Sequence, residues 1–105
     1  MEPKALIMDL SEFKKSLSAE HPPEGLSLTL RALWTDAKGD WDAAHKTVQG
    51  SDERDAARVH AYLHRKEGDD SNAAYWYQRA SRPVSEVPLA EEWEQLVEAL
   101  LRAAK

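Results

Sequence analysis

A chain of 105 residues with a net charge of −5 and no cysteine fits a single domain that folds without disulfides or thiolate metal sites. Its 42% apolar residues exclude a disordered chain, and its acidic balance disfavours nucleic-acid binding, which requires clustered Lys and Arg. The N-terminal apolar run, residues 5–8, is too short for a signal peptide, and no segment approaches the roughly 20 apolar residues of a membrane span. We therefore expect a cytoplasmic protein that contacts neither nucleic acid nor a membrane.

The first predicted element is a short helix near the N-terminus. Asp9 and Glu12, three residues apart, form the pattern of a capping box, which predicts a helix ending near Ser18. The following stretch His-Pro-Pro-Glu-Gly, residues 21–25, predicts a break, and its Pro23 suits the first turn of the next helix.

Four further helices are predicted between residues 26 and 80, in two pairs. Within each pair the helices are separated by Gly39-Asp40 or Gly68-Asp69. Glycine adopts the left-handed conformation that ends a helix, and aspartate caps the helix that follows. Such a short connection forces the two helices into an antiparallel hairpin. Gly50, followed by Ser51 or Asp52 as the cap, predicts the boundary between the pairs.

The last predicted helix carries the clearest apolar stripe of the chain. It follows a loop over residues 82–88, and its stripe from Leu89 to Leu101 includes Trp93 and must be covered. Since no segment alternates like a strand, we predict an all-α fold of about six helices. Its parts are an N-terminal helix and Pro-rich turn (1–25), two helix pairs (26–83) and a capping amphipathic helix (84–105), all in one domain (1–105).

The helix pairs resemble the tetratricopeptide repeat (TPR). The matching positions are Gly68-Asp69, Ala73, Tyr77 and Ala80 in the second pair, and Gly39-Asp40 and Ala44 in the first. The resemblance implies an array of antiparallel helix hairpins that binds a protein or peptide partner along its first helices, or that associates with itself. Residues 60–80 also resemble a family of small bacterial proteins, which implies no activity.

One face of the fourth helix predicts a binding surface. Arg58, Tyr62 and Arg65 follow one another at helical spacing, at positions that line the groove according to the TPR resemblance. Arginine pairs with carboxylates through two hydrogen bonds, and tyrosine supplies an amphipathic anchor. We expect the three side chains to share a surface that is at least partly exposed and binds a carboxylate or an acidic peptide. The alternative is a solvated face whose charges pair locally, as Asp55 would with Arg58.

Three of the four histidines form a second candidate site. His60 and His64 lie one helical turn apart, and Glu67 follows three residues later. Two imidazoles and a carboxylate at this spacing can bind zinc or another divalent metal, and His45 from the preceding helix can complete the set. The alternative, which the sequence favours, is that the histidines are buried and structural, each hydrogen-bonded to a tyrosine or a backbone carbonyl.

Signatures of catalysis and of nucleotide cofactors are absent from the sequence. It contains no phosphate loop, dinucleotide fingerprint or nucleophile elbow. We therefore favour a non-catalytic interaction or scaffold module without a cofactor. The alternative is a metal-binding protein or enzyme that uses His60, His64 and Glu67.

Overall fold

The computed structural model describes residues 8–103, and this range contains six α-helices and no strand. The helices are α1 (Leu10–Ser16), α2 (Leu28–Ala37), α3 (Trp41–Gln49), α4 (Arg54–Lys66), α5 (Asp70–Arg79) and α6 (Leu89–Ala103). The prediction of an all-α fold is confirmed. The predictions made for the apolar run at residues 5–8 lie, apart from Met8, outside the described residues.

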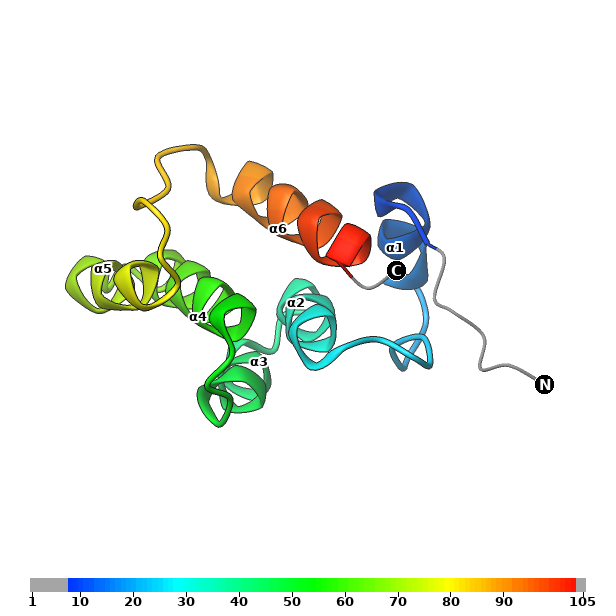
Figure 1. Ribbon diagram of the computed structural model, residues 1–105. Helices are drawn as coiled ribbons and strands as arrows, with labels where there is room; N and C mark the ends of the chain where they lie inside the picture. Colours follow the sequence, from blue (N-terminus) through cyan, green and yellow to red (C-terminus); the bar gives the residue numbers. More distant parts are fainter. Residues whose placement is uncertain (1–7, 104–105) are drawn as a thin grey trace.

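The helices are arranged as two hairpins with a further helix across them (Figure 1). Helix α2 packs against α3, and α4 packs against α5, while contacts between α3 and α4 hold the hairpins together. Helix α6 packs on both α2 and α4, and α1 packs against α6. The first helices of the two hairpins are therefore the ones that α6 covers.

The two predicted Gly-Asp turns are confirmed and share one geometry. Gly39 and Gly68 have φ angles of +95° and +89°, in the left-handed region. Asp40 and Asp69 each accept a hydrogen bond from a backbone N–H in the first turn of the next helix, at 3.0 and 3.2 Å. The same pair of residues thus ends one helix and begins the next in both hairpins.

Two predicted helix starts are wrong by a few residues. Helix α2 begins at Leu28 because the side chain of Ser27 caps it, so Pro23 stays outside the helix. Helix α4 follows Glu53, which makes no side-chain cap, and Ser51 instead accepts a hydrogen bond from the Glu53 backbone N–H at 3.2 Å. A serine hydroxyl can bond several nearby backbone groups, so the sequence alone does not fix where it ends a loop.

The main core lies where α6 meets α2 and α4. Its largest fully buried side chains are Phe13, Leu30, Leu33, Val48, Val59, Leu63 and Val97. Trp93 of α6 is only 8% exposed, and its ring lies 5.8 Å from that of Phe13. Its indole N–H also donates a hydrogen bond of 3.0 Å to the carbonyl of Leu33. The apolar stripe of α6 is therefore covered, as its pattern required.

A second, smaller core lies between α4 and α5. It is formed by Ala61, Ala73 and Tyr77, with Trp76 packed against it. The two alanines allow the helices to approach closely, which brings the tryptophan of α5 against the histidine-bearing face of α4.

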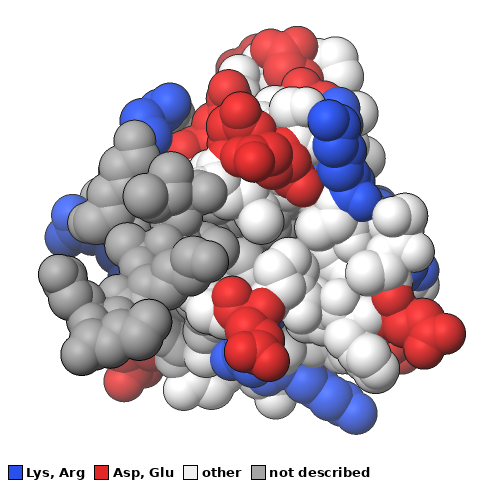
Figure 2. Space-filling model, turned by 90° about the vertical axis from the view of Figure 1, so that its right-hand side faces the viewer, with Lys and Arg blue, Asp and Glu red and all other residues white. Residues whose placement is uncertain are grey.

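The described surface mixes charges of both signs. On the face shown in Figure 2, acidic and basic side chains are interspersed with uncharged ones. Among the described helices, none combines the length and the apolar character that a membrane crossing requires.

Replacing Trp93 tests whether the core depends on α6. We expect Trp93→Ala to lower the free energy of unfolding by about 3 kcal/mol, because it removes a buried ring and leaves a cavity. Urea denaturation measures the change. Tyr75→Ala is the matched control, since Tyr75 is 50% exposed and its loss should lower the free energy by well under about 1 kcal/mol. Equal effects of the two substitutions would show that the core does not need α6.

Candidate metal centre

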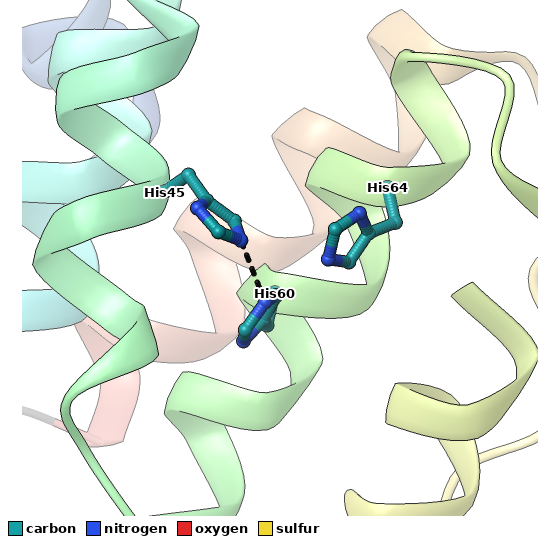
Figure 3. Close-up of side chains that lie close together, drawn as sticks. All are labelled: His45, His60 and His64. Atoms are coloured by element: carbon teal, nitrogen blue, oxygen red, sulfur yellow. Dashed lines mark hydrogen bonds between the residues drawn. The ribbon is translucent and has the colours of Figure 1, made fainter. Parts of the chain in front are cut away.

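Three histidines from two helices converge at the contact between the hairpins (Figure 3). His45 lies on α3, and His60 and His64 lie one turn apart on α4. Each offers one ring nitrogen, and these three atoms lie within 4.8 Å of one another. Helical spacing positions two of the rings, and the packing of α3 on α4 supplies the third.

His45 and His60 are in direct contact. Their Nε2 atoms are 2.9 Å apart, so one ring donates a hydrogen bond to the other. Each ring also stacks on a tryptophan: Trp41 lies 4.9 Å from His45 between ring centres, and Trp76 lies 3.9 Å from His60. The tryptophans restrict the rotation of both imidazoles and shield them from water.

His64 is oriented by an acidic neighbour on its own helix. Its Nδ1 atom lies 2.7 Å from a carboxylate oxygen of Glu67. A neutral imidazole that donates its Nδ1–H to a carboxylate keeps the lone pair on Nε2, which is then available to a ligand. The distance is short for such a hydrogen bond, and the carboxylate fixes the tautomer of the ring as well as its orientation.

Burial favours the uncharged form of two histidines of this cluster, His45 and His60. Burial lowers the pKa of His60 to about 4, and the neighbouring His45 and His64 add to the decrease. The pKa of His45 is also lowered, first by burial and then by His64. Neutral imidazoles have the free lone pairs that metal ligation requires.

The structure confirms part of the histidine prediction and changes the rest. His60 and His64 are buried, with 4% and 6% of their surfaces exposed. Their hydrogen-bond partners are His45 and Glu67, and neither is a tyrosine or a backbone carbonyl. Glu67, a ligand only in the alternative interpretation of the sequence, hydrogen-bonds His64 and lies outside the group of three histidines, in a second group of potential ligands with His64 and Asp69.

Sequence reasoning missed three residues of this site. Trp41 and Trp76 each stack on a histidine of the cluster, and for Trp41, which precedes His45 by one turn, helical spacing was the signal in the sequence. Asp69 forms a second group of potential metal ligands together with His64 and Glu67. The sequence indicates for it only the role of the α5 cap.

The predicted binding face of α4 is largely covered by α6. Tyr62 is 3% exposed, and its hydroxyl donates a hydrogen bond of 3.2 Å to Asp36 of α2. Arg65 forms an ion pair of 2.6 Å with Glu92 of α6 and also donates to the carbonyl of Val87. The prediction of an exposed surface shared by these residues is wrong for Tyr62, because α6 packs on the face that carries it.

Arg58, the third residue of that face, has a different environment. It is half-buried, and its nearest carboxylate oxygen, on Asp55, is 3.9 Å away. This long contact corresponds to the alternative prediction, in which Arg58 pairs with Asp55 of its own helix. Whether Arg58 binds a carboxylate from outside the chain stays a prediction.

Comparisons with protein-family models, with curated proteins and with solved structures give no match for this chain. Its function must therefore be inferred from the chemistry and placement of its own side chains.

The lowered pKa of His60 predicts how stability depends on pH. An unfolded histidine titrates near 6.5, whereas folded His60 titrates near 4. Between these values the unfolded chain binds a proton that the folded protein does not. The free energy of unfolding should therefore decrease as the pH falls from 6.5 to 4, by up to about 1.4 kcal/mol per pH unit, and the contribution of His60 is fully present above pH 6.5.

Urea denaturation in the presence of EDTA measures this dependence. His60→Gln should show a shallower decrease than the wild type between pH 6.5 and 5. His21→Gln is the matched control, because His21 is exposed and lies outside the cluster. Parallel profiles for the wild type and His60→Gln would contradict the prediction.

Proposed function

We propose that the protein binds a divalent transition-metal ion, zinc foremost, through His45, His60 and His64. The observation that carries this proposal is the convergence of three imidazole nitrogens, within 4.8 Å of one another, from two helices. Three histidines are a known ligand set for zinc, whereas magnesium and calcium prefer oxygen ligands.

The distances in the cluster are close to those a metal ion requires. Tetrahedral zinc binds imidazole nitrogens at about 2.0–2.1 Å, which places neighbouring nitrogens roughly 3.3 Å apart. The Nε2 atoms of His45 and His60 are 2.9 Å apart, and the whole set lies within 4.8 Å. Small rotations of the rings would suffice, and the ion would replace the hydrogen bond between the two imidazoles.

The surroundings of the cluster support ligation. A histidine ligand usually donates its other N–H to a carboxylate, and Glu67 is placed to accept this bond from His64. The stacked rings of Trp41 and Trp76 make the site drier, which strengthens the bonds to a charged ion.

A bound ion would connect the two hairpins. Two of its ligands come from α4, and the third comes from α3, across the contact between the hairpins. Ion binding would therefore stabilise the relative position of the hairpins, while three protein ligands leave the fourth position for water or a further group.

The competing interpretation, a TPR-like groove that binds peptides along α2 and α4, has less support. Tyr62 and Arg65, which were to line that groove, contact Asp36 and Glu92 within the chain. A partner on this face would have to displace α6.

Calorimetric titration with zinc tests the proposed function. The apo protein should bind one equivalent of zinc. Glu67→Gln should weaken binding by about 10- to 100-fold, and His45→Ala, which removes a ligand, by more. His45 is suited to substitution because it is half-buried, so that its loss should leave the fold intact.

The matched control is His21→Ala, which removes an exposed histidine outside the cluster and should bind zinc like the wild type. Zinc at 100 times its dissociation constant should also raise the free energy of unfolding by about 2.7 kcal/mol. Zinc binding that persists unchanged in His45→Ala, or its absence from the wild type, would refute the proposed function.

A further inference from the structure

A pocket of about 200 Å³ lies between α4, α6 and the segment that connects α5 to α6. This connection, residues 80–88, arches from the end of α5 to the start of α6 (Figure 1). Arg58 of α4 and Arg82 of the connection both line the pocket, and Leu96 of α6 forms an apolar part of its wall. The three histidines of the metal centre do not line it.

The acidic side chain in the pocket wall is already paired within the fold. One carboxylate oxygen of Glu92 accepts a hydrogen bond of 2.6 Å from Arg65, and the other accepts one from the hydroxyl of Tyr77. Glu92 is buried, so this pairing is what makes its charge tolerable. It therefore leaves the two arginines of the pocket without a strong counter-ion.

Arg58 and Arg82 place two positive charges at one pocket. The contact of Arg58 with Asp55, at 3.9 Å, is longer than a hydrogen bond. Within residues 8–103, no carboxylate forms an ion pair with Arg82. Burial lowers the pKa of Arg58, and repulsion by Arg82 is the next contribution. An anion between the two guanidinium groups would relieve this repulsion.

We propose that this pocket binds a carboxylate carried on a small apolar body, with Arg58 and Arg82 holding the carboxylate. Pro83 and Val84 line the pocket beside Arg82, and Val84 is 51% exposed, so the apolar body has a surface to contact. A volume of 200 Å³ equals the space of roughly seven water molecules, which suits a short-chain organic acid or the last residue of a peptide.

The proposal keeps one residue of the binding face predicted from the sequence and exchanges the others. Arg58 remains, but its partner is Arg82 from the connection, because Arg65 is already paired with Glu92. It is independent of the metal centre, and the two can be tested separately.

NMR titration of the isotope-labelled protein with valerate tests the pocket. We expect saturable shifts of the arginine side-chain Nε–Hε signals and of the backbone signals of residues 82–85. Pentanamide, which has the same shape without the charge, should cause no such shifts. Arg82→Gln should weaken valerate binding by about tenfold or more, because a hydrogen-bonded charge is lost.

The choice of variants keeps the test decisive. Arg82 is exposed and lies in the connection, so Arg82→Gln should fold even if a change at the half-buried Arg58 does not. Arg31→Gln is the matched control, since it removes an exposed arginine from α2, outside the pocket. Equal shifts with valerate and pentanamide, or wild-type affinity for valerate in Arg82→Gln, would overturn the proposal.

A tripeptide ending in Leu distinguishes the two sources of the carboxylate. Tighter binding of the tripeptide than of valerate, lost when its C-terminus is amidated, would support the terminal carboxylate of a peptide chain. Binding of valerate without binding of the tripeptide would support a free organic acid. If neither binds at millimolar concentration, the pocket is not a carboxylate site.

Discussion

The docking of α6 on α2 and α4 is the contact on which the rest of this structure depends. Trp93 anchors it through the carbonyl of Leu33, and Glu92 anchors it through Arg65 and Tyr77. The first contact closes the main core, and the second buries a charge that only these partners compensate. Because Glu92 also forms one wall of the pocket beside Arg58, the same helix that stabilises the hairpins determines which arginines remain available for a ligand.

The two proposed sites use the two sides of α4 in different ways. The side that faces α3 and α5 carries His60 and His64; burial lowers the pKa of His60, and Trp76 stacks on its ring. The side that faces α6 carries Tyr62 and Arg65, whose polar atoms are satisfied inside the chain. One helix thus carries the histidine cluster on one side and, on the other, two residues paired within the chain beside Arg58, which lines the pocket.

Local patterns in the sequence predicted the hairpins well. Features that depend on contacts between distant segments could not be predicted in this way. Gly39-Asp40 and Gly68-Asp69 determine their turns through their own backbone and side chains, so the prediction needed no knowledge of the fold. The pairing of His60 with His64 likewise follows from helical spacing. The burial of Tyr62 does not, because it depends on where α6 packs. Arg82 was missed for the same reason, since its place in the pocket depends on the path of a loop.

The hydrogen bond from Trp93 to Leu33 has a kinetic consequence, because it joins residues 60 positions apart. Each hairpin closes through a connection of three residues, whereas the docking of α6 must close a long loop of chain. Loop closure loses more entropy as the loop lengthens, and contacts between distant residues slow folding. We expect the hairpins to form early and α6 to arrive last. The histidines, which belong to the hairpins, would then be assembled before the arginine pocket exists.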